Sequence, residues 1–458
     1  MKYRLRDIPA LFATAGGRAQ LRNGAMYRGW PVMARLARLW RQTRARRTRV
    51  VAVVGSFGKS TTVGAVSAVL GVGPHPAMLR NAWSAVALAV LRVRPAQRHA
   101  VIEVGIAAPG QMAQYARVVR PDIVVVTSIG SEHNRSLVTL GETRAEKARM
   151  VGALAPSGVA VLNGDDPNVM WMAGQTRARV VTFGFGAQCD VRASDFRLEW
   201  PAGSRFRVSA LGEERDVAVR FLGRHLVYPA LAAIAVAKLE GVALDAALPL
   251  LQAVPPVPGR MQPVPLPNGA IVLRDDCKSV LETMHAALDV LADIPAPRRI
   301  VVFGDVAEPP SNQRPLYQDL GRRVAAIAAH FVVVGHGLQR YAGGAKRAGM
   351  PPEAVHDGGR TPRQAAAVLA RLLQPGDVVL IKGRDTQMLD RVRLILEGRR
   401  VGCDIVFCSL HRSSCEGCPM LESGWGTHRV VMERASRGRE ARDPRRIPRT
   451  ARSSRGNG

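Results

Sequence analysis

A glycine-rich segment between an apolar run and a helix pattern constrains this chain most. The β-branched run at residues 50–54 predicts a buried parallel strand that ends at Gly55. It is followed by Gly58, Lys59, Ser60 and Thr61, and then by apolar spacing that predicts a helix over residues 60–70. Glycines let backbone N–H groups approach a phosphate, the lysine reaches the outer phosphates of a nucleotide, and the serine hydroxyl binds Mg²⁺. The sequence therefore predicts a nucleotide-binding phosphate loop.

Composition favours a cytoplasmic protein. Peripheral contact with the inner face of the membrane is compatible with it. The 458 residues are enough for two or three domains. No apolar run reaches the roughly 18–20 residues that span a bilayer, and no signal-peptide pattern follows the first charges. Six cysteines in so long a chain do not make a disulfide framework.

The net charge of +29 is concentrated at the two ends. Residues 1–50 hold 13 Lys and Arg side chains against a single acid. Within them, residues 27–44 predict an amphipathic helix, with Val32, Met33, Leu36, Leu39 and Trp40 at helical spacing and Arg35, Arg38 and Arg41 opposite. Such a helix either lies on a membrane surface or packs on the first domain, and the spacing does not separate the two. For the basic C-terminal tail a solvated end is favoured, so nucleic acid is disfavoured as a partner.

Alternating strand and helix patterns divide the chain into five parts. Residues 1–48 form the basic N-terminal segment, and residues 49–254 form a central domain with strands at 50–54, 100–104, 122–127 and 159–162 and a short antiparallel excursion at 191–220. A proline-rich hinge leads into a second α/β domain at residues 255–400. Residues 401–421 are cysteine-rich, and residues 422–458 predict a disordered tail. The fold class is α/β: a central P-loop ATPase domain with a mainly parallel sheet, followed by a C-terminal Rossmann-like α/β domain.

Several side chains fall where parallel strands end, which is where ligands collect in such sheets. Glu103 closes a strand beside the phosphate loop, and a metal-binding role is favoured over a turn cap. His133 follows another strand end, where a ligand and a structural histidine are equally plausible. Lys147 lies further on in a helix, and its spacing alone indicates a surface lysine. In the second domain, Asp276 and Lys278 follow a strand, and Arg260 can clamp a phosphate.

Four cysteines form a separate group near the C-terminal end. Cys403, Cys408, Cys415 and Cys418 have the spacing C-x4-C-x6-C-x2-C. Four thiolates, or three with His411, can close a structural Zn²⁺ site, but this spacing is irregular and slightly favours reduced, unbonded thiols.

The ordered set of motifs resembles the Mur ligases, most closely those of the MurF type. The resemblance covers roughly residues 49–395. It rests on the phosphate loop, Glu103-Val104-Gly105, Arg120-Pro121-Asp122 through His133, residues 161–167, Gly223-Arg224-His225, Pro258-Gly259-Arg260, Asp275-Asp276, residues 302–305 and Lys382-Gly383.

This resemblance implies an ATP-dependent ligase that phosphorylates a peptide-like carboxylate and lets an amine, an amino acid or dipeptide, attack the acyl phosphate. In the MurF type this reaction serves peptidoglycan precursor synthesis. By resemblance, the loop residues Gly55, Gly58, Lys59, Ser60 and Thr61 hold ATP, and Ser60, Glu103 and His133 hold Mg²⁺. Lys147 matches the family's carbamylated lysine, Arg260 contacts the γ-phosphate, and Asp276 and Lys278 lie near the ribose and the transferred phosphate. His225 belongs to the segment that binds adenine.

The chain departs from the family pattern at several positions. Leu226 and Pro229 replace both asparagines of the adenine segment, and Leu281 and Glu282 stand where Asn-Pro is usual. Only about 50 residues precede the phosphate loop, where MurF carries a UDP-sugar-binding domain. Two alternatives therefore stay open: a ligase making another peptide or a polyamide of the cyanophycin or poly-glutamate type, and a degenerate nucleotide-binding scaffold at the membrane surface.

Overall fold

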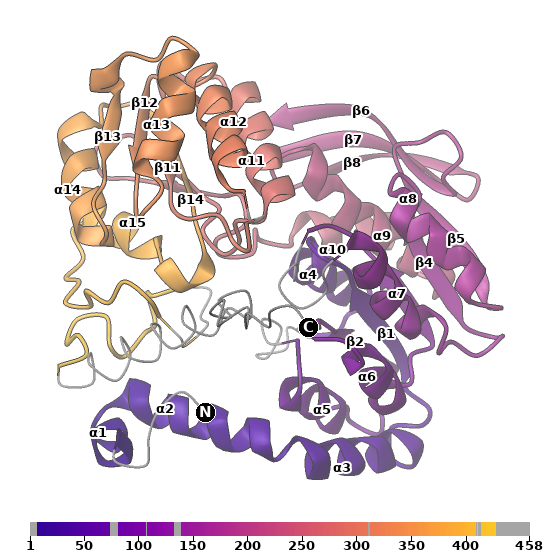
Figure 1. The fold of residues 1–458 in the computed structure, drawn as a ribbon. Coiled ribbons are helices and arrows are strands. Elements are labelled where there is room, and N and C mark those ends of the chain that lie inside the picture. The colour runs from indigo at the N-terminus through magenta and orange to yellow at the C-terminus, as the bar shows by residue number, and fades with distance from the viewer. Residues whose placement is uncertain are drawn as a thin grey trace, which may run out of the picture.

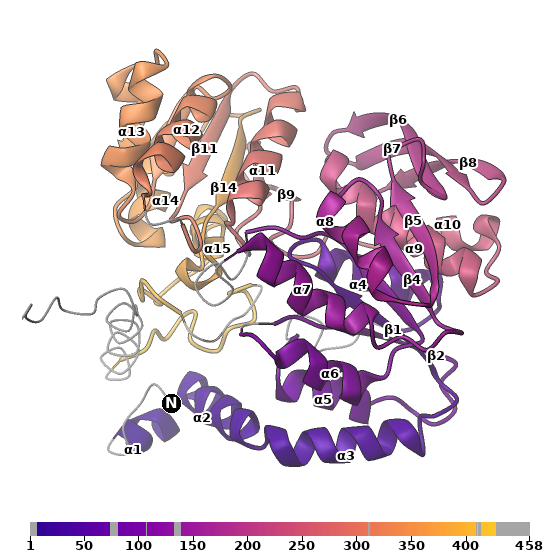
Figure 2. The ribbon, with the colours of Figure 1, turned by 45° about the vertical axis from the view of Figure 1, so that its right-hand side comes forward.

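Three helices at the N-terminal end run along one edge of the molecule (Figures 1 and 2). The computed structural model describes residues 7–73, 81–106, 108–131, 139–309, 312–408, 410 and 414–426. The three helices are α1 (Ile8–Ala13), α2 (Ala15–Arg28) and α3 (Trp30–Gln42). The predicted helix over 27–44 is therefore present as α3, but Arg41, expected on its polar face, is buried.

The central domain is built on an eight-stranded sheet with the order β2-β1-β3-β4-β5-β6-β7-β8. Neighbouring strands pair in parallel as far as β6, and β7 pairs antiparallel with both β6 and β8. The strands are β1 (Arg49–Val54), β2 (His99–Glu103), β3 (Ile123–Val126), β4 (Val159–Asn163), β5 (Arg179–Gly184), β6 (Val191–Glu199), β7 (Gly203–Ala210) and β8 (Glu213–Val219). The mainly parallel sheet and its antiparallel excursion are confirmed.

Helices cover both faces of this sheet, and successive residues of β1 point to opposite cores. Val51 and Val53 pack with α4 (Lys59–Val69), α9 (Val227–Leu239) and α10 (Leu244–Gln252). Ala52 and Val54 pack with α3, α5 (Ser84–Leu91), α6 (Gln111–Val119) and α7 (Leu140–Val151). A strand buried on both sides must be apolar throughout, which is why the run at 50–54 shows no alternation.

The C-terminal domain has a six-stranded sheet with the order β13-β12-β11-β14-β10-β9. All pairs are parallel except β9 with β10. Its strands are β9 (Gln262–Pro265), β10 (Ile271–Arg274), β11 (Arg299–Phe303), β12 (His330–Val333), β13 (Val355–Asp357) and β14 (Val378–Lys382). Its helices are α11 (Leu281–Asp293), α12 (Arg314–Ala325), α13 (Leu338–Arg347), α14 (Pro362–Leu372) and α15 (Asp390–Leu396). The predicted α/β class is confirmed for both domains.

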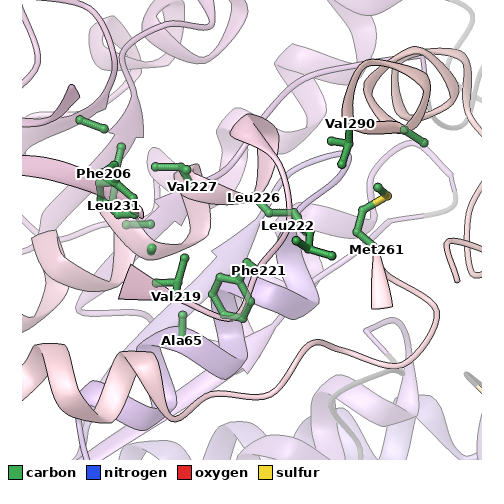
Figure 3. Close-up of a cluster of buried hydrophobic side chains, with 14 of the residues drawn as sticks. Ala65, Phe206, Val219, Phe221, Leu222, Leu226, Val227, Leu231, Met261 and Val290 are labelled. Carbon is green, nitrogen blue, oxygen red and sulfur yellow. The ribbon is translucent and has the colours of Figure 1, made fainter. Parts of the chain in front are cut away.

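An apolar cluster joins the two domains (Figure 3). Met261 and Val290 of the C-terminal domain belong to the same buried cluster as Phe221, Leu222 and Leu226 of the central domain. This shared core holds the rim of the second sheet close to the phosphate loop of the first.

The described C-terminal lobe, residues 401–408, 410 and 414–426, packs between α15 and α2. Its core contains Cys408, Cys415 and Trp425, and Ala19 of α2 packs against it. Trp425 is only 2% exposed, so the predicted start of a disordered tail at residue 422 is wrong. The reason is that this indole fills space next to Gly16 of α2, a contact that local composition does not reveal.

Candidate active site

The phosphate loop connects β1 to α4. Gly55 and Gly58 have φ angles of +146° and +83°, which side chains other than glycine adopt with difficulty. A Cβ atom on Gly55 would lie 2.0 Å from Thr127 Oγ1. The Nζ atom of Lys59 donates to the carbonyl oxygens of Gly55 at 2.8 Å and of Ser56 at 3.1 Å. The loop therefore curls around its own lysine at the N-terminus of a helix.

Oxygen ligands gather beside this loop. Ser60 Oγ donates to Glu103 Oε2 at 2.9 Å, and Asn81 Nδ2 donates to Glu103 Oε1 at 2.7 Å. The parallel register of β1 and β2 pairs Val53 with Glu103, which brings the carboxylate level with the start of the loop. A hydroxyl and a carboxylate are hard oxygen donors, and this set fits Mg²⁺. His133 lies outside the described residues.

Lys147 extends from α7 toward the phosphate loop. Its side chain is only 1% exposed, and its Nζ atom donates to Ser56 Oγ at 2.8 Å. A capping box of Thr139 and Glu142 starts α7 and fixes the direction of this helix. The surface position that spacing alone indicates for Lys147 is therefore wrong, because this side of α7 faces the phosphate loop and not the solvent.

Lysines of the second domain complete the same region. Lys278 Nζ donates to the carbonyl oxygen of Ser56 at 2.7 Å. Lys382, fully buried, pairs with Asp275 and donates to the carbonyl oxygen of Lys278 at 2.9 Å. Burial lowers the pKa of Lys382, and Asp275 opposes that shift.

Ser56 thus becomes the meeting point of three ammonium groups. Its carbonyl oxygen accepts from Lys59 and Lys278, and its hydroxyl accepts from Lys147. Ser56 is not among the site residues predicted from the sequence, although its position inside the loop was a usable signal. Three cations around one residue form a site of strong positive potential, which is suited to a polyanion such as a nucleoside triphosphate.

The remaining predicted residues lie at the rim of the second sheet. Asp276 is buried and pairs with Arg274 at 3.2 Å, and Arg274 in turn pairs with Asp390 at 2.9 Å. Burial raises the pKa of Asp276, while Arg274 opposes the shift. Arg260 is half-buried. Burial lowers the pKa of Lys382, and the charge of Arg260 adds to that shift. Burial raises the pKa of Cys277, and the charge of Arg260 opposes that rise. Asp276 is therefore held within its own domain rather than by the lysines around Ser56.

His225, just before α9, and Glu282, in the first turn of α11, are two further residues of the candidate site. Burial lowers the pKa of His225 to about 4, so its ring is neutral at physiological pH. Glu282, at the start of α11, accepts hydrogen bonds from the backbone N–H and the hydroxyl of Ser131, both at 2.7 Å. Glu282 thereby ties the C-terminal domain to the loop after β3. Sequence reasoning recorded Glu282 only as a departure and missed this contact.

The four cysteines of the C-terminal lobe line one small cavity of about 10 Å³. Burial raises the pKa of Cys408 to about 11 and also raises that of Cys415. Cys403 Sγ accepts hydrogen bonds from Arg391 Nη1 and Trp425 Nε1, each at 3.3 Å. Across the described ranges no three His, Cys, Asp or Glu side chains are gathered as around a metal ion. The Zn²⁺ expectation stays a prediction.

Comparison with known protein families shows which family the chain belongs to. The profile of the Mur ligase middle domain matches residues 53–237, and the profile of the Mur ligase glutamate ligase domain matches residues 259–384. The chain therefore belongs to the Mur ligase family, and it is an ATP-dependent ligase.

Within the family the chain is MurF-like. UDP-N-acetylmuramoyl-tripeptide--D-alanyl-D-alanine ligase of Mycobacterium tuberculosis (strain H37Rv) is 31% identical over 395 residues, covering 80% of this chain and 76% of that protein. The enzyme of the same name from Escherichia coli (strain K12) is 29% identical over 282 residues, covering 60% and 62%. MurF from Acinetobacter baumannii has the same fold, with a TM-score of 0.71 at 23% identity over 80% of each chain. MurF from Thermotoga maritima in complex with ADP gives 0.69 at 19% identity, covering 80% of this chain and 83% of that one.

Proposed function

We propose that this protein joins a muramyl-peptide-type carboxylate to an amine in peptidoglycan precursor synthesis, through an acyl phosphate made with ATP. The observation that carries this proposal is the gathering of Lys59, Lys147 and Lys278 around Ser56, beside the Ser60–Glu103 oxygen pair. A carboxylate and a triphosphate repel one another, and concentrated positive charge allows them to meet.

The chemistry has two balanced steps. A carboxylate oxygen of the acid attacks the γ-phosphorus of ATP, the bond to the β-phosphate oxygen breaks, and ADP leaves. The nitrogen of the amine then attacks the acyl carbon, inorganic phosphate leaves, and the nitrogen loses its proton as the amide forms. Mg²⁺ bound by Ser60 and Glu103, with His133 assigned by resemblance, would supply charge neutralisation on the phosphates.

Each lysine has a role that follows from its position. Lys59 lies within the curl of the phosphate loop and binds the phosphates of ATP. Lys147 matches the lysine that the family carbamylates, and its Nζ atom lies at the phosphate loop, 2.8 Å from Ser56 Oγ. When Lys147 is carbamylated, Lys59 and Lys278 are the cations that remain at Ser56. Lys278 comes from the other domain, and its Nζ atom lies at the phosphate loop, where it binds the transferred phosphate.

The second domain supplies the outer contacts in this proposal. Arg260 binds the γ-phosphate, and Asp276, oriented by Arg274, lies near the ribose. His225 contacts adenine as a neutral ring, since burial lowers its pKa to about 4. Leu226 and Pro229, which replace the two asparagines, are buried, so this segment supplies no amide hydrogen bonds to adenine at these positions.

The proposal is tested by following ADP and phosphate release with matched acid and amine pairs, starting with UDP-muramyl-tripeptide and D-alanyl-D-alanine. The expected result is release only when both partners are present. Lys147→Arg should lower turnover by about a hundredfold or more while ATP binding persists, because a guanidinium keeps the positive charge but cannot form the carbamate. Lys346→Arg, on the exposed surface of α13, is the matched control. Normal turnover by Lys147→Arg would contradict the role of Lys147.

The same screen decides between the alternatives. Turnover with amino-acid polymers instead of muramyl peptides would favour a ligase of the poly-glutamate or cyanophycin type. ATP binding without release of ADP from any pair would favour a nucleotide-binding scaffold. A reaction that uses ATP takes place in the cytoplasm in this proposal.

We also propose that Cys403, Cys408, Cys415 and Cys418 bind one structural Zn²⁺. Arg391 supports this because its buried guanidinium donates to carbonyl oxygens and to Cys403 Sγ, with no carboxylate partner in the described part of the chain. Thiolates on Zn²⁺ would supply the missing negative charge, and N–H donors to sulfur commonly accompany such sites. The cavity has room for a single ion, and binding would draw the four sulfur atoms together.

Metal analysis of the purified full chain tests the zinc proposal. One Zn²⁺ per chain is expected, and Cys408→Ser with Cys415→Ser should remove it. Cys189→Ser, which lies in the central domain, should keep it. A chain that carries no Zn²⁺ and takes none up when it is added would overturn the proposal.

A further inference from the structure

Helix α3 has one face buried against the central domain and an opposite face that is exposed and apolar. Trp30, Ala37 and Arg41 face the central domain and are buried. Val32 and Leu36 on the other side are 61% and 53% exposed, and Leu39 is 59% exposed. Positions separated by four and three residues share one helix face, so these three side chains form a continuous apolar stripe. We call it the α3 stripe.

A hollow lined with arginines lies next to this stripe. It has a volume of about 870 Å³, and its lining includes Arg38, Arg41, Arg46, Arg117, Arg120 and Arg149. Arg41 pairs with Asp122 at 2.9 Å, and Arg149 pairs with Glu146 at 3.2 Å. The other four have no carboxylate partner among the residues that the structure describes. This arginine hollow therefore carries an uncompensated positive charge.

The stripe and the hollow belong to one face of the molecule. Arg38 lies on α3 and lines the hollow, and exposed Arg35 flanks the stripe on the same side. Both views place α3 along an outer edge of the molecule, next to α5 and α6 (Figures 1 and 2). The hollow is bounded by Pro121 and Asp122, which precede β3, so it opens at the amino-terminal edge of the sheet. The phosphate loop lies at the opposite, carboxyl edge.

We propose that this face binds the surface of a bilayer that contains anionic phospholipid. The α3 stripe enters the region between headgroups and acyl chains, and the arginine hollow takes up lipid phosphate groups. Apolar side chains beside basic ones on an interfacial helix have this mode of binding, and the attraction grows with the anionic lipid content. No helix in the described ranges is long and apolar enough to cross the bilayer, so the contact is peripheral. Charge selects the occupant, because a second copy of this chain would bring a second set of arginines against the first.

Flotation of the full-length protein with vesicles tests this. Vesicles of equal parts phosphatidylglycerol and phosphatidylcholine should bind the protein, vesicles of phosphatidylcholine alone should not, and added salt should release it. Leu36→Gln with Leu39→Gln should weaken binding about tenfold or more. Arg38→Ser with Arg117→Ser should weaken it by a similar factor. Leu211→Gln with Leu250→Gln, which also changes exposed leucines, is the matched control.

The proposal is overturned if the protein does not bind anionic vesicles, or binds both vesicle types equally. It is also overturned if the control variant loses binding to the same extent, or if light scattering shows a stripe-dependent dimer without vesicle binding. Release by inorganic phosphate at constant ionic strength would instead assign the hollow to a free anion and also contradict it. The stripe and hollow variants leave the phosphate loop untouched, so ADP release in solution should stay unchanged. Failure here is therefore distinguishable from failure of the proposed ligase function.

Discussion

Arg41 offers a quantitative test of how α3 is attached. Its guanidinium donates to the carbonyl oxygens of Val119, Ala45 and Arg120 at 3.1, 2.6 and 3.0 Å, and to Asp122 at 2.9 Å. Burial lowers the pKa of Arg41, and Asp122 opposes the shift, so the side chain stays charged at neutral pH. One side chain therefore holds together α3, the end of α6 and the start of β3.

Replacement by methionine keeps the length of the side chain and removes all of these bonds. The Asp122 carboxylate is 34% exposed and keeps its bond from the Val50 N–H at 2.8 Å, so water can replace the guanidinium there. The main loss is at the carbonyl oxygens, where an unsatisfied buried acceptor costs about 1–3 kcal/mol. We expect Arg41→Met to lower the free energy of unfolding by about 2–4 kcal/mol, below the full cost of breaking a buried ion pair.

Urea unfolding followed by tryptophan fluorescence measures this change, because Trp30 and Trp40 lie on α3 itself. Arg38→Met, on the exposed side of the same helix, is the control and should stay within about 0.5 kcal/mol of the unchanged protein. If Arg41→Met is no more destabilising than Arg38→Met, the reasoning that α3 is anchored through buried carbonyl bonds is refuted.

Three further predictions concern the site. Gly55→Ala should abolish ATP binding in calorimetry, because its φ of +146° and the 2.0 Å approach to Thr127 Oγ1 leave no room for a methyl group; wild-type affinity would contradict this. Glu282→Gln should lower kcat/KM about tenfold, since it weakens two charge-assisted bonds to Ser131, and an unchanged value would mean that turnover does not use this contact. The pKa of His225 falls from 6.5 unfolded to about 4 folded, so its stabilisation is present above pH 6.5 and lost as the pH falls toward 4. His225→Gln should show a shallower loss of stability over that range than the unchanged protein, and parallel curves would refute the assignment.

Local sequence patterns predicted the strands, the helices and the phosphate loop, because each of these elements is determined largely by residues that are neighbours in the sequence. The β-branched run at 50–54, the glycines after it and the strand at 159–162 all signal their structure within a few positions. The strand β5 was missed, since its pattern begins at exposed Arg179 and ends at Gly184, which weakens the apolar signal.

Local patterns could not predict contacts between residues that are far apart in the sequence. Lys278 and Ser56 are separated by 222 positions, and Glu282 and Ser131 by 151. Lys147 was assigned to the site only through the family resemblance. Its burial against the phosphate loop depends on the path of α7, which the sequence pattern does not show. Arg41 was placed on the polar face because the spacing of arginines on α3 does not reveal which of them meets Asp122.

The contact between α2 and the C-terminal lobe has a consequence for the order of folding. A Cβ atom on Gly16 would lie 2.6 Å from the Trp425 ring, so the two segments interlock closely. During synthesis α2 leaves the ribosome early, while its partner follows about 400 residues later. Until then the part of α2 around Gly16 has no native cover. Helix α2 is thus among the last parts of the chain to complete its packing, and loss of residues at one end should loosen the other.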